Sequence, residues 1–329
     1  MVKRSHLPVV TIGGGTGSST LLRGLKVFTD AITAIVTVAD DGGGSGILRR
    51  ELGILPPGDA RNCLFALANE ENKVKELFHY RFNEGSLSGQ SLGNLLVAAL
   101  ADIYGSFDEG LRRAGEILAV TGKVVPMTLD NVALCAELED GSHVAGESVL
   151  PSEVIARKSR IKRAYLDPPV RKTQKETVDA ILEAKLILLG PGSLYTSLVP
   201  NLLVDEIREA VRATDATVVY IANLMTQPGE TDGFGVTEHL DVVETYLGEG
   251  TVDRIYVNDT AMTADIGAHY EAKHQFPVLM KPGERERIEA RGIRVVEGPY
   301  LDLASGYVRH DAARLVEDLF LDTTRIYHG

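Results

Sequence analysis

A run of glycines that directly follows a β-branched segment constrains this chain more than any other feature. Val9–Ile12 is followed by Gly13, Gly14, Gly15 and Gly17, and then by apolar residues at helical spacing. Glycine permits a tight turn and lets backbone amides approach a ligand, because it has no Cβ. The helix N-terminus that follows adds unpaired amides with partial positive charge. The stretch therefore predicts a phosphate-binding turn.

The elements around this turn predict a βαβ unit. Pro8–Ile12 is typical of a buried strand, Ser19–Val27 of a helix, and Ala31–Val38 of a second strand. This order predicts parallel strands in a Rossmann-like α/β fold, a mostly parallel sheet flanked by helices. The dinucleotide fingerprint Gly-x-Gly-x-x-Gly is incomplete, because Ser18 stands where the third glycine belongs. By itself the motif is weak evidence for NAD.

Two carboxylates follow the second strand. Asp40 and Asp41 precede Gly42–Gly46, a second glycine-rich loop at the same predicted sheet edge. A carboxylate there can bind a ribose hydroxyl, hold a divalent cation such as Mg²⁺ or act as a base. Asp41 is the candidate metal ligand. The alternative interpretation is a solvated Asp-Gly turn.

Composition excludes several classes of function. The net charge of −12 argues against a nucleic-acid-binding surface, which needs excess basic charge. Cys63 and Cys135 are too few for a disulfide framework, so we expect two reduced, buried thiols. No apolar run approaches the roughly 20 residues of a membrane span. We therefore expect a soluble, cytoplasmic protein.

The middle of the chain predicts a helical insertion and a hairpin. Apolar spacing predicts helices at 60–69, 74–82, 91–104 and 107–120, with Asp59 a candidate cap of the first. We interpret residues 47–122 as an insertion over the site. Asp140-Gly141 predicts a hairpin turn between strands at 132–139 and 143–149. The basic run 157–163 is typical of a solvated face; the alternative is a site for an acidic partner or a phosphate-bearing ligand.

Later predicted strands also end in small or polar residues. Gly190–Ser197 follows a buried run, Asn223–Thr231 follows the next strand, and Asn258-Asp259 follows a third. Such endings meet at one edge of a parallel sheet, which predicts a shared cleft. Tyr270, Lys273 and the segment Arg309–Asp311 are candidates to close its far side.

Six motifs in order give the chain a resemblance to a known family. They are Ile12–Gly17, Val38–Gly43, Pro57–Asn62, Ser91–Leu95, Gly190–Ser197 and Met225–Thr231. Together they resemble the YvcK-type gluconeogenesis factors, in a superfamily that includes the 2-phospho-L-lactate transferase CofD. The resemblance implies one CofD-like α/β domain over residues 1–329, a cytoplasmic bacterial protein and a homo-oligomer. The helical insertion at about 47–122 belongs to that domain.

The resemblance also implies two possible activities. YvcK-type members bind UDP-sugars such as UDP-N-acetylglucosamine and are linked to cell shape and envelope synthesis on gluconeogenic carbon sources. The transferase branch moves a phospholactyl group from a guanosine diphosphate derivative to a deazaflavin, with Mg²⁺. The Pro57–Asn62 and Gly190–Ser197 motifs are similar to the first branch. Gly44, Ile47 and Gln90 depart from the family's serine, arginine and histidine, which favours binding over turnover.

The first hypothesis is therefore a regulatory binding protein, and the second is an enzyme in which Asp40 and Asp41 serve as base and Mg²⁺ ligand. In the first, the two glycine loops hold a diphosphate, while Asn223, Tyr270 and Arg309 contact base and sugar. The candidate ligand-binding residues are Gly13, Gly14, Gly15, Thr16, Gly17, Ser18, Asp40, Asp41, Asn62, Asn94, Gly190, Gly192, Ser193, Thr196, Ser197, Asn223, Thr226, Gln227, Tyr270 and Arg309.

Overall fold

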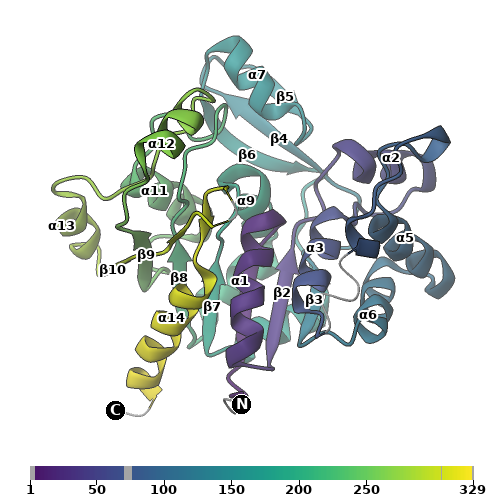
Figure 1. The fold of residues 1–329 in the computed structure, drawn as a ribbon, viewed down its shortest axis with the longest axis horizontal. Coiled ribbons are helices and arrows are strands. Elements are labelled where there is room, and N and C mark those ends of the chain that lie inside the picture. Colours follow the sequence, from purple (N-terminus) through teal and green to yellow (C-terminus); the bar gives the residue numbers. More distant parts are fainter. Residues whose placement is uncertain (1–3, 70–75, 305, 328–329) are drawn as a thin grey trace.

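The computed structural model describes residues 4–69, 76–304 and 306–327. A seven-stranded parallel sheet forms its centre, in the order β10-β9-β8-β7-β1-β2-β3 (Figure 1). The predicted Rossmann-like α/β fold is confirmed. The strands are β1 (Val9–Gly13), β2 (Ile32–Val36), β3 (Lys123–Pro126), β7 (Leu186–Leu189), β8 (Thr217–Ile221), β9 (Arg254–Asn258) and β10 (Arg294–Gly298).

The central strands are continuous apolar runs because helices cover both faces of the sheet. Every residue of β1, β2 and β7 is buried. On one face, helix α1 (Gly15–Phe28) contacts both α3 (Gly58–Leu67) and α14 (Ala312–Tyr327). Figure 1 shows α1 and α14 standing in front of the sheet. Within the described ranges, no helix combines the length and apolar character needed to cross a bilayer.

The crossovers on the other side of β1 use a second set of helices. They are α8 (Lys175–Glu183), α9 (Val199–Leu202), α10 (Asp205–Ala213) and α11 (Val236–Leu247), and α10 contacts the other three. Right-handed crossovers on the two sides of β1 place their helices on opposite faces. Two short helices, α12 (Ala264–Glu271) and α13 (Glu284–Glu289), follow β9.

The helical insertion lies between the neighbouring strands β2 and β3, on the right in Figure 1. It contains α3, the 3₁₀ turn η1 (Gly85–Leu87), α2 (Gly43–Leu52), α5 (Leu92–Tyr104) and α6 (Phe107–Ile117). Most of the expected helix at 60–69 and those at 91–104 and 107–120 are present. The start of the predicted helix 74–82 lies outside the described residues, and 76–79 are helical.

Two expectations for this region are wrong. The stretch Gly42–Gly46 is not an open loop, because α2 begins at Gly43 and the amide of Gly46 donates to the carbonyl of Gly42 at 2.8 Å. Asp59 does not cap the helix either: Pro57 holds that position without a side-chain bond, and Asp59 lies in the first turn. A carboxylate in the first turn still interacts favourably with the helix dipole.

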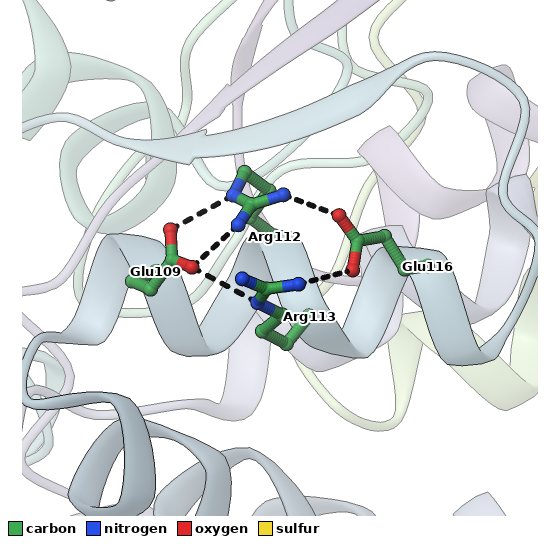
Figure 2. A network of polar contacts seen from close by, with 4 residues as sticks. All are labelled: Glu109, Arg112, Arg113 and Glu116. Carbon is green, nitrogen blue, oxygen red and sulfur yellow. Dashed lines mark hydrogen bonds and ion pairs between the residues drawn. The ribbon is translucent and has the colours of Figure 1, made fainter.

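A network of exposed ion pairs runs along α6, as Figure 2 shows. Arg112 bridges Glu109 and Glu116, and Arg113 does the same with its Nε 2.9 Å from Glu109 Oε1. The Arg113 guanidinium also lies 4.8 Å from the ring centroid of Tyr104 on α5. Exposed pairs at this spacing each contribute only about 0.3–0.5 kcal/mol. The network therefore stabilises α6 locally.

A small antiparallel sheet lies at the carboxyl ends of the central strands, at the top of Figure 1. The predicted hairpin is confirmed as β4 (Ala133–Leu138) and β5 (His143–Ala145), and β6 (Ile161–Asp167) adds a third strand after α7 (Leu150–Arg157). The basic run falls on α7 and β6. Its members are exposed, and Lys162 pairs with Glu137.

The C-terminal helix is anchored to the sheet by one carboxylate. Asp322 on α14 lies 2.6 Å from Arg254 Nη1 and 3.1 Å from both Arg294 Nη1 and the hydroxyl of Tyr256. Arg254 and Asp322 are about nine-tenths buried. Removing one member of a buried pair leaves the other charge uncompensated, which is strongly destabilising.

We therefore expect Asp322→Ala to lower the free energy of unfolding by about 3 kcal/mol. Urea denaturation at neutral pH measures this change. Glu317→Ala, an exposed neighbour on the same helix, is the matched control and should stay close to the parent protein. Equal stability of the two variants would show that the network does not hold α14.

Candidate functional site

The site begins at the point where the direction of winding reverses. Strands β1 and β7 are neighbours in the sheet, with Ile12 opposite Leu189. From β1 the chain proceeds to β2 on one side, and from β7 it proceeds to β8 on the other. The turns after these two strands therefore diverge, and such a switch point opens a crevice at the carboxyl edge of the sheet.

The two turns approach each other backbone to backbone. A Cβ on Gly17 would lie 2.4 Å from the carbonyl oxygen of Pro191, so no other residue fits without displacing that turn. The hydroxyl of Ser18 donates to the same carbonyl at 3.4 Å. Beneath them, buried Asn201 donates through Nδ2 to the carbonyls of Gly13 and Ser197 at 3.2 and 2.8 Å.

Two amide side chains hold the second turn from the β8 side. Asn223 donates through Nδ2 to the carbonyl of Gly192 at 2.8 Å. Gln227 donates through Nε2 to the hydroxyl of Ser193 at 2.7 Å. Both side chains thus fix backbone or hydroxyl groups that face the crevice.

A cavity of about 420 Å³ fills this crevice, a size typical of small-molecule sites. It is lined by Gly14, Gly15, Thr16, Gly17, Thr20, Pro191, Gly192, Ser193, Ser197, Asn223, Leu224, Met225, Gln227, Tyr270, Gln275, Val308, Arg309 and His310.

One end of the cavity is built for an anion. Helix α1 starts at Gly15, whose φ of 69° favours glycine, and its first turn carries no acidic residue. Unpaired amides at a helix N-terminus bind phosphate groups. Thr16, Ser193 and Ser197 also line the cavity, and each of them carries a hydroxyl group.

The opposite wall comes from the C-terminal part of the chain. The hydroxyl of Tyr270 on α12 accepts a hydrogen bond from the amide of Val308 at 2.9 Å. Arg309 and His310 form β12, which pairs with β11 (Leu301–Asp302). Arg309 is exposed, and it is the one Lys or Arg among the described residues that line the cavity.

The structure brings together about half of the candidate residues at this cavity. Gly13, Ser18, Gly190, Thr196 and Thr226 are buried and do not line the cavity. Six lining residues were not named individually as candidates: Thr20, Pro191, Leu224, Met225, Gln275 and Val308. Most of these carry no polar group that a motif search would select. His310 was expected only as part of the segment Arg309–Asp311, and it does line the cavity.

The remaining candidates, Asp40, Asp41, Asn62 and Asn94, do not line the cavity. Asp40 accepts from the amide of Gly42 at 2.8 Å, and Asp41 from the amide of Ser148 at 2.8 Å. Asn62 accepts from Arg61 Nη2 at 2.7 Å, and Asn94 Nδ2 lies 3.5 Å from Ser45 Oγ.

Asp59 is the carboxylate that lies closest to the glycine turn. A Cβ on Gly14 would lie 2.1 Å from Asp59 Oδ2, and the amide of Gly15 donates to this carboxyl group. Burial and the neighbouring Asp40 raise the pKa of Asp59 to about 7, against the lowering effect of the Gly15 amide. The Pro57–Asn62 motif includes Asp59, but the sequence alone predicts only a helix-capping role for it.

Further acidic groups surround this position. Burial, with Asp40 and Asp59 next in effect, raises the pKa of Glu147 well above its ordinary value. Burial also raises the pKa of Glu230 to about 7, although the Tyr195 amide and the Thr196 hydroxyl bind it. Among the described residues, no group of three or more His, Cys, Asp or Glu side chains is placed to hold a metal ion.

Residues 9–301 match the family model for 2-phospho-L-lactate transferase CofD. The chain belongs to the CofD family. It is 45% identical over 315 residues to the gluconeogenesis factor of Bacillus subtilis, covering 95% of this chain and 97% of the relative. It is 44% identical over 310 residues to the gluconeogenesis factor of Halalkalibacterium halodurans, covering 94% of each.

A solved structure agrees with this assignment. A UPF0052 family protein from Bacillus halodurans superimposes with a TM-score of 0.91 at 43% identity, covering 97% of this chain and all of that one. The resemblance to gluconeogenesis factors of the CofD family, predicted from six motifs, is thereby confirmed.

The raised pKa of Asp59 makes a prediction about pH. Below about pH 3.8 the carboxyl is protonated in both the folded and unfolded states; above about pH 7 it is ionised in both. Between these values only the unfolded chain has released the proton, so the cost to folding grows with rising pH. We expect Asp59→Asn to raise the melting temperature by roughly 2 °C or more at pH 8, and by less at pH 4.5.

Thermal unfolding at the two pH values measures this difference. Asp130→Asn, at an exposed carboxylate, is the matched control and should show no pH-dependent change relative to the parent. A stabilisation by Asp59→Asn that is equal at both pH values, or larger at pH 4.5, would contradict the prediction.

Proposed function

We propose that this protein is a cytoplasmic, UDP-sugar-binding regulatory factor that supports cell shape and envelope synthesis during growth on gluconeogenic carbon sources. The observation that carries the proposal is the cavity at the switch point, whose lining combines backbone amides and hydroxyls with apolar and aromatic side chains. A nucleoside diphosphate needs both, since its phosphates are anionic and its base is flat and largely apolar.

The phosphate end offers the amides of the α1 first turn, which carries no acidic residue of its own, although the Gly15 amide donates to Asp59. The base end combines Leu224, Met225 and Val308 with the ring of Tyr270. Tyr270 is fixed through its hydroxyl to Val308, which reduces the ordering cost when a base packs on it. Arg309 is exposed to solvent and lines the cavity, so it can add one positive charge to the site.

The lining also favours binding over turnover. Among the described residues that line the cavity there is no Asp, Glu, Lys or Cys. The lining groups that can act as acids, bases or nucleophiles are His310, Tyr270 and the hydroxyls of Thr16, Thr20, Ser193 and Ser197. His310 is already bound through Nε2 to the carbonyl of Ala222. We further propose that copies of the chain associate with one another and that nucleic acid is not a partner, in keeping with the net charge of −12.

We expect UDP-N-acetylglucosamine to bind saturably and to be recovered unchanged. Arg309→Ala should weaken its binding by roughly tenfold or more, because a charged hydrogen bond contributes about 1.5–3 kcal/mol. Isothermal titration calorimetry measures the dissociation constants, and chromatography of the ligand checks for product.

Arg287→Ala, at another exposed arginine of the same half of the chain, is the matched control. Its affinity should equal that of the parent. No binding of any UDP-sugar to the parent protein would overturn the proposed function. Rescue of cell shape in a Bacillus subtilis strain that lacks its own relative tests the physiological part.

A second candidate function is a Mg²⁺-dependent transferase, favoured by the family model and by the carboxylates beside the glycine turn. Mg²⁺ in phosphate sites is commonly held by one or two carboxylates together with phosphate oxygens of the substrate. Asp59 and Asp40 fit that donor set, and the buried oxygens Asn94 Oδ1 and Gln90 Oε1 have no partner in the described part of the chain. Asp41 is constrained in the same way as Asp40, because one backbone amide donates to each carboxylate, from Ser148 and Gly42 respectively.

In this alternative, bound Mg²⁺ would neutralise charge on the diphosphate of the donor. The glycine turns would hold the phosphates, and Asp59 would have to lose its proton first. Incubation with Mg²⁺, a guanosine-diphosphate-linked phospholactyl donor and a deazaflavin acceptor tests it. Release of the nucleoside monophosphate that Asp59→Asn abolishes would establish turnover and reject a pure binding role.

A further inference from the structure

His310 lines the cavity, and one of its ring nitrogens is already hydrogen-bonded. It follows Arg309 on β12, and its Nε2 lies 3.2 Å from the carbonyl oxygen of Ala222, at the end of β8. A carbonyl oxygen only accepts hydrogen bonds, so Nε2 carries the proton. Burial lowers the pKa of His310 to about 4, so the imidazole is neutral at physiological pH.

The other ring nitrogen of His310 is therefore a bare acceptor. In a neutral imidazole with Nε2 protonated, Nδ1 holds a lone pair. No hydrogen bond to Nδ1 is found among the residues that the structure describes, and Nδ1 is not one of the buried unpaired atoms. Because His310 lines the cavity, this acceptor is available to a ligand.

The ligand group that suits this nitrogen is a donor. A phosphate oxygen at neutral pH is an acceptor and would be repelled by the lone pair, so the diphosphate belongs at the α1 end. The ring imide of uracil presents an N3–H between two carbonyl oxygens, whereas cytosine presents a lone pair at N3. Leu224, Met225 and Val308 line the same cavity as His310, and their apolar side chains suit the flat faces of a base.

We propose that His310 is a specificity-determining residue whose Nδ1 accepts a hydrogen bond from the imide N3–H of a uracil base. The proposal rests on the proposed function, because it assigns the base of the nucleotide that the cavity binds. It predicts selection of uridine over cytidine nucleotides through one acceptor, because the carbonyl of Ala222 holds the imidazole in a single tautomer. A site built to accept a hydrogen bond rejects a ligand that lacks the donor, because the buried acceptor is then left unpaired.

Titration calorimetry with matched ligands tests this assignment. In the parent protein, UDP should bind about tenfold or more tightly than both N3-methyl-UDP and CDP. In His310→Ala, UDP should bind more weakly and the preference over both ligands should fall to roughly twofold, since the acceptor is gone and space is made for the methyl group. His6→Ala, at an exposed histidine far from the cavity lining, is the control and should keep the parent preference.

His310→Gln is a second variant, because the carbonyl oxygen of glutamine can accept the same bond and should restore part of the preference. Equal binding of UDP and N3-methyl-UDP to the parent protein would overturn the assignment, even if His310→Ala does not fold. An unchanged preference in folded His310→Ala would overturn it as well. Binding of UDP-N-acetylglucosamine without discrimination at N3 would reject this inference alone, whereas no binding of any uridine nucleotide would reject it together with the proposed function.

Discussion

The close approach of two backbone turns is the constraint on which the rest of the site depends. The turn after β1 and the turn after β7 touch at Gly17 and Pro191, where even a methyl group would collide. Asn201 binds both turns from below through one amide nitrogen. Because the contact is made by backbone atoms, it can change little without moving β1 or β7, both of which are buried in the sheet. The cavity, its amide-lined end and the positions of its hydroxyl groups all follow from this contact.

The sequence predicted the parts of the fold that depend on local pattern. Buried β-branched runs, the glycine turn and Asp140-Gly141 are short-range signals, and the central strands and the hairpin lie where those signals place them. The sequence could not predict that the Asp59 side chain lies against Gly14, because this contact depends on how α3 packs beside the glycine turn. The third strand of the small sheet, β6, was missed for a similar reason. Its pattern is half exposed, and within the described residues it pairs with β4 alone.

The candidate site was predicted best where the ligand group is polar. Glycines, hydroxyls and amides after strands indicate phosphate contacts, and several of them line the cavity. Leu224, Met225 and Val308 carry no such signal, because an apolar residue after a strand looks the same whether it packs in a core or against a base. The carboxylates Asp40 and Asp41 follow a strand as predicted, but backbone amides bind both of them away from the cavity.

The pairing of β1 with β7 also divides the molecule into two halves of the chain. The residues that meet at the cavity, such as Ser18 and Pro191, are 173 positions apart. Strands β2 and β3 extend the sheet on one side of this seam, and β8, β9 and β10 extend it on the other. A molecule that fills the cavity would contact residues from both halves of the chain. A ligand that binds only the folded protein raises the free energy of unfolding, so a ligand that contacts both halves would stabilise the whole sheet.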